Sequence, residues 1–253
     1  MRVFFAGIEA YTDTIWGVGD VDVLFSFYII RDSIERFMEF IKKYKKKYPN
    51  RKTFCDSGGF TFLKKGHTQI PKNYVNKYAD FLEKYRLWID YAANIDVTDP
   101  KVTLRNQKYL ESKGLKILPV YHPNEPIDYL ERYSKGYDYI AIGGLVPLKG
   151  KKRVETTIRI INTALKFNPA LKIHLFGVND LKIIKLLSKK VYSVDATTWL
   201  SYSRYGGVIS PSGRLIHRNE LKIGKPHYKK MAKYSLAMWK SIFKKIGGVE
   251  FAD

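Results

Sequence analysis

The chain has 253 residues, enough for one large domain or two small ones. Hydrophobic residues make up 45% of it and aromatic residues 15%, which excludes a mainly disordered chain, and the single cysteine, Cys55, excludes an intramolecular disulfide and a cysteine-rich zinc cluster. Forty-five basic residues against 24 acidic ones give a net charge of +21, which favours a polyanionic partner such as nucleic acid.

Short segments rich in β-branched and aromatic residues recur along the chain and predict strands. In chain order these are Arg2 to Ile8, Val21 to Phe27, Lys52 to Cys55, Trp88 to Ile95, Lys116 to Tyr121, Tyr137 to Ile142, Lys172 to Phe176 and Val191 to Val194. No apolar run approaches the roughly 18 residues of a membrane span, and no signal-peptide pattern is present. We therefore expect a cytoplasmic protein, of cellular or viral origin, with no membrane partner.

Amphipathic stretches separate most of these strands and predict helices. They are Ser33 to Tyr48, Pro71 to Tyr85, Pro100 to Lys113, Pro126 to Tyr133, Lys152 to Phe167 and Asn179 to Ser188. Pro71, Pro100 and Pro126 stand at expected helix starts, where the first turn tolerates proline. Asn179 and Asp180 are the expected caps of the last helix in this series.

The alternation of strands and helices predicts a (β/α)₈ TIM-like barrel, with an open doubly wound sheet as the alternative. The first unit is expected to be irregular, because Glu9 to Asp20 is short for a full crossover helix. Residues 201–253 are expected to form a basic C-terminal extension on the barrel, a loop followed by a helix from about Pro226 to Ile246. No linker or repeat interrupts residues 1–253, so we expect a single catalytic domain.

Carboxylates and glycines follow the ends of several predicted strands. They are Asp56, Asp96, Tyr121 and His122, Gly143 and Gly144, Gly177, and Asp195. In a (β/α)₈ barrel these positions converge at the C-terminal mouth, where the active sites of this fold lie. Two carboxylates there can divide the work at a glycosidic bond, one as nucleophile and one as general acid and base. The alternative for any single Asp is a helix cap.

Four motifs, in this order along the chain, resemble those of the tRNA-guanine transglycosylases. The DSGGF/Y signature of that family corresponds to the five residues from Asp56 to Phe60, and its GGL turn to Gly143, Gly144 and Leu145. Its (M)GV strand end corresponds to Phe176, Gly177 and Val178. The segment that opens with the nucleophilic Asp of the family corresponds to residues 195–206, which begin at Asp195 and have Arg204 and Gly206 in step. The similarity runs from about Arg51 to Gly207.

The resemblance implies a role for each matched residue. Asp195 would attack C1′ of a guanosine nucleotide and form a covalent glycosyl-enzyme intermediate. Asp56 would protonate the departing guanine and then accept a proton from an incoming 7-deazaguanine base of the preQ0 type. The base itself would lie among the side chains and backbone of Ser57, Gly58, Phe60, Asp96, His122, Gly143, Gly144, Leu145, Phe176 and Gly177. No cofactor is implied.

The chain departs from that family in several respects, among them the absence of the usual Pro-Thr-Arg in the segment after Asp195. The usual zinc site of three cysteines and a histidine cannot form here, so no metal and no zinc subdomain are expected. The base-reading Gln of the tRNA enzymes has no obvious counterpart, and Tyr121 and His122 occupy its region. These departures make the chain similar to the reduced branch, the 7-deazaguanine DNA transglycosylases of phages and bacterial modification clusters. We therefore expect a DNA substrate, flipped or single-stranded, with tRNA as the alternative.

Basic residues near the predicted mouth are candidates for contact with the phosphate backbone. These are Lys149, Lys151, Lys152, Arg153, Arg204, Arg214 and Arg218. A charge run of this kind is also typical of a solvated helix face. Two alternatives to a base-exchange enzyme stay open, a non-catalytic nucleic-acid-binding barrel and a barrel glycosidase acting on a small nucleoside. Of the remaining residues, Cys55 and His174 are interpreted as core or wall.

Overall fold

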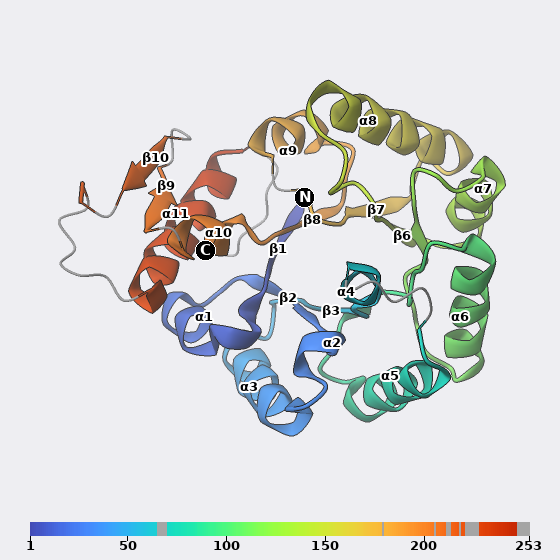
Figure 1. Cartoon of the computed structure of the whole chain (residues 1–253), viewed down its shortest axis with the longest axis horizontal. Helices are drawn as coiled ribbons and strands as arrows, with labels where there is room; N and C mark the ends of the chain where they lie inside the picture. Colours follow the sequence, from blue (N-terminus) through green and yellow to red (C-terminus); the bar gives the residue numbers. More distant parts are fainter. Residues whose placement is uncertain are drawn as a thin grey trace.

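Eight parallel strands form the centre of the molecule in the computed structural model, which describes residues 1–64, 70–178, 180–204, 206–210, 214–217, 219–220 and 228–246 (Figure 1). The strands are β1 (Arg2–Ala6), β2 (Asp22–Ser26), β3 (Thr53–Asp56), β4 (Tyr91–Ala92), β5 (Val120–Tyr121), β6 (Tyr139–Ile142), β7 (Lys172–Leu175) and β8 (Ser193–Ala196). Their order in the sheet is β4-β3-β2-β1-β8-β7-β6-β5.

The two outer strands of this order meet through a single backbone bridge. Ala93, just after β4, pairs in parallel with Leu118, just before β5. The Leu118 N–H donates to the Ala92 carbonyl at 2.8 Å, and the Asn94 N–H donates to the Leu118 carbonyl at 2.9 Å. The ring of strands therefore closes, and the predicted (β/α)₈ barrel is confirmed.

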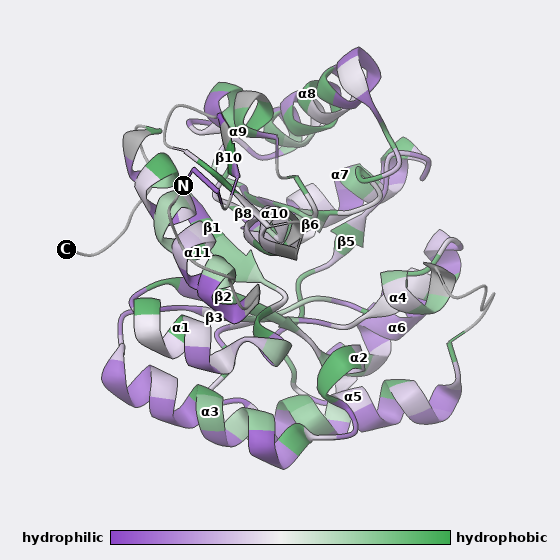
Figure 2. Ribbon diagram, turned by 60° about the vertical axis from the view of Figure 1, so that its left-hand side comes forward, coloured by the Kyte–Doolittle hydropathy of each residue, from purple (hydrophilic) through white to green (hydrophobic). Residues whose placement is uncertain are grey.

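Helices surround the ring of strands, as Figure 1 shows. They are α1 (Thr12–Val18), α2 (Phe27–Ile30), α3 (Ile34–Lys47), α4 (Gly59–Lys64), α5 (Lys72–Tyr85), α6 (Pro100–Ser112), α7 (Ile127–Gly136), α8 (Gly150–Phe167) and α9 (Leu181–Leu187). Green and purple residues alternate along α3 and α5 in Figure 2, and the buried side of α3 carries Phe37, Met38, Ile41 and Tyr44. Within the described residues, no helix is both long enough and apolar enough to cross a bilayer.

The elements differ from the expected ones mainly at the edges. The first crossover is irregular, as expected, with a 3₁₀ turn at Ile8–Ala10 followed by the short α1. Strands β4 and β5 have two residues each, shorter than their predicted ranges. For β5 the physical reason is Pro119, which has no N–H to give to a ladder. Where a loop was expected from residue 201, the end of α10 (Thr198–Arg204) is followed by an antiparallel hairpin, β9 (Gly207–Ile209) with β10 (Leu215–His217).

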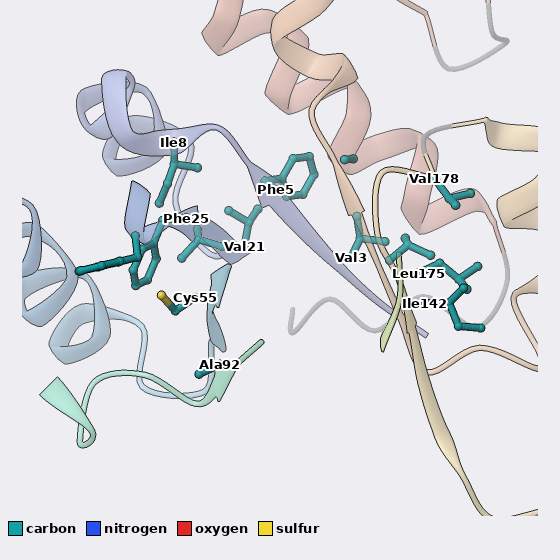
Figure 3. Packing of buried hydrophobic residues seen from close by; sticks show 14 of the residues in the cluster. Val3, Phe5, Ile8, Val21, Phe25, Cys55, Ala92, Ile142, Leu175 and Val178 are labelled. Atoms are coloured by element: carbon teal, nitrogen blue, oxygen red, sulfur yellow. The ribbon is translucent and has the colours of Figure 1, made fainter. Parts of the chain in front are cut away.

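Alternate strand residues face two different cores. Phe4, Leu24, Phe54, Val120 and Ala141 fill the inside of the barrel with their neighbours. The residues between them face outward and pack under the helices, and Figure 3 shows part of this outer core. Cys55 belongs to it and is fully buried, and burial raises the pKa of its thiol well above the usual value. The interpretation of Cys55 as a packed core residue is therefore confirmed.

The last helix, α11 (Tyr228–Lys245), packs on the barrel next to α1 and α10. Its buried Phe243 lies edge-to-face against Phe5 of β1, with ring centroids 6.1 Å apart. Trp199 of α10 is buried in the same region and donates its indole N–H to the Ala6 carbonyl at 2.9 Å. Trp199 is therefore a structural anchor of the C-terminal segment.

Ion pairs at the N-terminal end of the barrel tie the first strands together. The Asp90 carboxylate accepts from Lys45 at 2.7 Å, from Lys52 at 2.9 Å and from the Thr53 N–H at 2.9 Å. Burial raises the pKa of Asp90, but these donors outweigh it and hold the pKa below its usual value. On the neighbouring strands, Arg2 pairs with Asp22 at 2.8 Å.

We expect Asp90→Ala to destabilise the protein by about 2 kcal/mol at pH 7, because two lysines and an amide lose their shared acceptor. The measurement is the free energy of unfolding in urea. The matched control is Asp32→Ala, since the Asp32 side chain is 83% exposed and a surface pair contributes little. Equal unfolding free energies for the two variants would contradict the structural role of Asp90. Because the folded pKa of Asp90 is depressed, its contribution is present above about pH 4 and lost as the pH falls further.

Candidate active site

The two acidic residues of the predicted catalytic pair lie on strands that end at the same mouth. Asp56 is the last residue of β3 and pairs in register with Ser26, and Asp195 lies within β8, in register with Phe4. Each is two positions from a residue that faces the barrel interior, Phe54 and Ser193 respectively, so both carboxylates face inward. Because Asp195 belongs to the strand itself, the alternative of a helix cap does not apply to it.

The Asp56 carboxylate lies in surroundings that disfavour its ionised form. Its pKa rises to about 7, first because of burial and then because of the negative charges of Asp96 and Asp195. The Gly58 N–H opposes the rise by donating to the carboxylate at 3.2 Å. Gly58 has φ 82°, and a Cβ there would meet the Cβ of Tyr28 at 2.3 Å, so only glycine fits the turn. Asp56 therefore exchanges its proton near neutral pH.

The Asp195 carboxylate is held by backbone. The Gly177 N–H donates to its Oδ1 at 2.6 Å, and the side chain is 8% exposed. Gly177 has φ 64°, and a Cβ there would lie 2.5 Å from the Val146 side chain. Gly177, two residues after the end of β7, is thus needed both for the turn and for the approach of its amide to Asp195. A carboxylate fixed in this way is pre-oriented to act as a nucleophile.

Asp96 and His122, which follow the neighbouring strands β4 and β5, form a pair at the mouth. Their side chains meet at 2.7 Å, between His122 Nε2 and Asp96 Oδ2. Burial lowers the pKa of His122, but the hydrogen bond and charge of Asp96 outweigh it, and the net pKa is raised. Glycines lie against both members of the pair, and a side chain at either glycine would collide with it. A Cβ on Gly59 would lie 2.4 Å from the Asp96 carbonyl, and one on Gly143 would lie 2.7 Å from His122.

The other predicted base-binding residues divide into exposed and buried ones. Phe60 is 49% exposed at the start of α4, and Gly144 is exposed with φ 66°. Leu145 and Ser57 are fully buried, and the Ser57 hydroxyl accepts from the Gly59 N–H at 3.3 Å. Ser57 thus shapes the turn after β3. Phe176 is half-buried and packs against the ring of His174, with centroids 4.5 Å apart.

The predicted phosphate-binding residues have different surroundings. Lys149, Lys151 and Lys152 are exposed at the start of α8, beside the mouth. Arg153 instead donates to the Gly177 carbonyl at 2.6 Å, so it supports the turn that holds Asp195. Arg214 pairs with Glu220. The side chain of Arg204 and the whole of Arg218 lie outside the described residues.

Two titratable residues near the site were not singled out as functional from the sequence. His174 lies in the barrel interior with Nε2 3.6 Å from Asp195 Oδ1. Glu125 is 8% exposed, and in the described part of the chain neither carboxylate oxygen has a hydrogen-bond partner. Burial raises its pKa to about 7, with the charge of Asp96 adding and that of His122 opposing. His174 and Phe176 are two residues apart in the strand predicted from Lys172 to Phe176, so the sequence indicates that they share a face. The sequence around Glu125 contains no comparable signal.

Metal binding has no support in the described ranges, where no group of three or more His, Cys, Asp or Glu side chains is arranged to hold an ion. The groups at the site that can exchange protons or attack a substrate are carboxylates and imidazoles. The site consists of a fixed carboxylate, a second carboxylic acid that titrates near neutrality, and a hydrogen-bonded pair of Asp96 and His122.

Comparisons with known proteins show the fold. No family model and no curated protein matches the chain. A chain from a structure of the tryptophan synthase α₂β₂ complex of Pyrococcus furiosus is 9% identical, with a TM-score of 0.60 over 96% of this chain and 97% of that one. A putative fructose-1,6-bisphosphate aldolase from Coccidioides immitis is 11% identical, with a TM-score of 0.58 over 97% and 90%. The tryptophan synthase α chain of Legionella pneumophila is 10% identical, with a TM-score of 0.56 over 97% and 91%. At such identities the likeness concerns the barrel alone.

Proposed function

We propose that this protein is a transglycosylase that exchanges guanine in DNA for a 7-deazaguanine base. The observation that carries the proposal is the pairing of two unlike carboxylates inside one barrel. Asp195 is fixed by the Gly177 amide, and Asp56 has a pKa of about 7. Displacement at a glycosidic carbon needs this division, because one group must be an ionised nucleophile while the other delivers and removes a proton. The sequence motifs around both residues point to the same chemistry.

The first half of the proposed reaction breaks the glycosidic bond. An oxygen of Asp195 attacks C1′, a C1′–O bond forms, and the C1′–N9 electron pair leaves with guanine. Protonated Asp56 gives its proton to the departing guanine and becomes a carboxylate. Because the pKa of Asp56 is near the working pH, its protonated form is populated at the start and its ionised form is accessible afterwards.

The second half restores the enzyme. The incoming 7-deazaguanine gives its N9 proton to the Asp56 carboxylate, and N9 attacks C1′ as the bond to Asp195 breaks. The sugar thereby keeps its original configuration, since it has been displaced twice. Asp96 and His122 supply the polar edge that would read the base, and exposed Gly144 brings backbone close to it.

The experiment that tests the proposal is mass spectrometry of nucleosides after incubation of the protein with DNA or tRNA and a set of candidate 7-deazaguanine bases. A 7-deazaguanine deoxynucleoside in the DNA digest is the expected product. Incorporation into tRNA alone would transfer the proposal to that substrate. Nucleic-acid binding without any incorporation would leave a non-catalytic barrel, and exchange on a free nucleoside that does not depend on polymer length would favour a small-substrate glycosidase.

DNA binding is expected to weaken at least about tenfold between roughly 50 and 200 mM salt, because lysines that meet phosphates release counterions. Replacing Lys149, Lys151 and Lys152 together by Ala is expected to reduce the slope of log affinity against log salt by about 2 to 3. Fluorescence anisotropy with a labelled oligonucleotide measures both. The matched control is a triple Ala variant of Lys43, Lys46 and Lys108, which are exposed on α3 and α6. Equal slopes for the two triple variants would exclude the start of α8 as the contact surface.

A further inference from the structure

His174 is a fully buried imidazole directly beneath the proposed nucleophile. Its ring lies among aromatic rings of the barrel interior, with centroids 4.5 Å from Phe176 and 4.7 Å from Phe54. Burial lowers its pKa, although the nearby charge of Asp195 opposes this, and the net pKa falls below the usual value. At neutral pH the ring is therefore neutral and carries one N–H.

The position of that proton depends on a chain of hydroxyl groups beside Nδ1 and on the Asp195 carboxylate beside Nε2. His174 Nδ1 lies 2.7 Å from Ser193 Oγ, and Ser193 Oγ lies 2.6 Å from the Tyr139 hydroxyl. If Nδ1 were the donor, Nε2 would direct a lone pair toward the Asp195 carboxylate, 3.6 Å away, which is repulsive. If Tyr139 donates to Ser193 and Ser193 donates to Nδ1, the proton is on Nε2 and points at Asp195. Electrostatics favour the second arrangement.

We infer that His174 is a positioning residue for Asp195. The His174 Nε2–H approaches Asp195 Oδ1 beside the Gly177 N–H, and this leaves the other carboxylate oxygen turned toward the substrate. This rests on the proposed base exchange. In the described residues both the Gly177 contact and the His174 contact fall on Oδ1. The separation of 3.6 Å exceeds a hydrogen bond, and such contacts commonly shorten when the substrate is engaged.

The contact acts on charge and leaves the proton in place. When Asp195 attacks C1′, its negative charge is used in forming the ester. When the incoming base displaces it, the charge returns to the carboxylate, and Nε2–H stabilises that leaving group. His174 keeps its proton in both steps. Loss of the donor is therefore expected to favour the ester over the free carboxylate and to slow its breakdown.

Two variants separate the donor from the packing. His174→Phe keeps a ring between Phe54 and Phe176 but has no N–H, whereas His174→Gln places an amide N–H near the Nε2 position. We expect the Phe variant to lower kcat of exchange about tenfold and to lower the KM for DNA with it, because slower breakdown of the ester lets the ester accumulate. The Gln variant should stay within about threefold of the wild type. We also expect a larger fraction of the Phe variant to be trapped as the covalent adduct on a denaturing gel, at fixed guanine concentration.

Activity and tautomer give independent outcomes. Equal kcat and equal adduct in the Phe and Gln variants, with unchanged melting temperatures, would overturn the inference while leaving the proposed function intact. A wild-type protein that gives neither adduct nor exchange on DNA or tRNA would overturn the proposed function, and the inference with it. The ¹⁵N NMR spectrum of the wild-type protein tests the geometry without activity. It should show the Nε2–H tautomer of His174, and the Nδ1–H tautomer would refute the assignment.

Discussion

Asp195→Asn is expected to reduce guanine exchange by at least about a thousandfold, because an amide oxygen cannot replace a carboxylate as the attacking group. The Asn side chain keeps the shape of Asp195 and an oxygen for the Gly177 N–H, so the fold and DNA affinity should survive. The measurement is release of labelled guanine from DNA, together with the covalent adduct on a denaturing gel. Neither should be detected above background, while binding by anisotropy stays within about threefold.

Asp195→Ala serves as the second variant, since it removes both side-chain oxygens. The two variants should fail in exchange alike and differ only in stability, where the Ala variant also leaves the Gly177 N–H unpaired. If either variant still exchanges labelled guanine at a rate near that of the wild type, Asp195 is not the nucleophile. A loss of DNA binding in both would indicate that the residue holds the mouth together rather than acting on the sugar.

Asp56→Asn is expected to abolish proton delivery and yet to stabilise the fold at alkaline pH. The folded pKa of Asp56 is about 7, above its usual value near 3.8, so the native state holds a proton that the unfolded chain releases. Stability from this group is complete below about pH 4 and is lost as the pH rises to about 7. At pH 8 the native state carries the full cost of the ionised, crowded carboxylate. Asn avoids that cost, so we expect the free energy of unfolding at pH 8 to rise by a few kcal/mol, at most about 4 kcal/mol.

Urea unfolding at pH 8 and pH 5, combined with exchange rates, measures both effects. The midpoint of Asp56→Asn should exceed that of the wild type clearly at pH 8 and less at pH 5, while kcat falls about a hundredfold or more. Asp90→Asn is the comparison, because the Asp90 carboxylate receives two lysine contacts and its loss should destabilise the fold at both pH values. An Asp56→Asn protein that is less stable than the wild type at pH 8 would show that Asp56 is a structural carboxylate.

The barrel and the position of its mouth follow from sequence because they depend on repeated local signals. Alternating strand and helix patterns gave the topology, and Pro100 at the start of α6, preceded by the cap Asp99, lies where predicted. The convergence of Asp56, Asp96 and Asp195 also follows, since the carboxyl ends of parallel strands meet at one face. The hairpin β9 and β10 was missed because its strands have three residues each and its turn signals resemble those of a loop.

The local environments could not be predicted, because they depend on contacts between segments distant in the chain. The pKa of Asp56 reflects burial and the charges of residues 40 and 139 positions later. His174 appeared to be an ordinary wall residue, and only the packing of β7 beside β8 places it under Asp195. Arg153 was expected to face phosphates, and its guanidinium instead donates to the Gly177 carbonyl. A pattern within one segment carries no information about such partners.

The ring of strands closes through the single bridge between Ala93 and Leu118, and Asp96 and His122 lie on opposite sides of this junction. Their 2.7 Å contact therefore links β4 and β5 where the backbone pairing of the barrel is shortest. In the proposed reaction a base that binds Asp96 competes with His122 for the same carboxylate. Binding of the base and closure of the barrel between β4 and β5 are therefore thermodynamically coupled. The rate of hydrogen exchange at the Asn94 and Leu118 amides, which form the bridge, would therefore report whether a base is bound at the mouth, without turnover of any substrate.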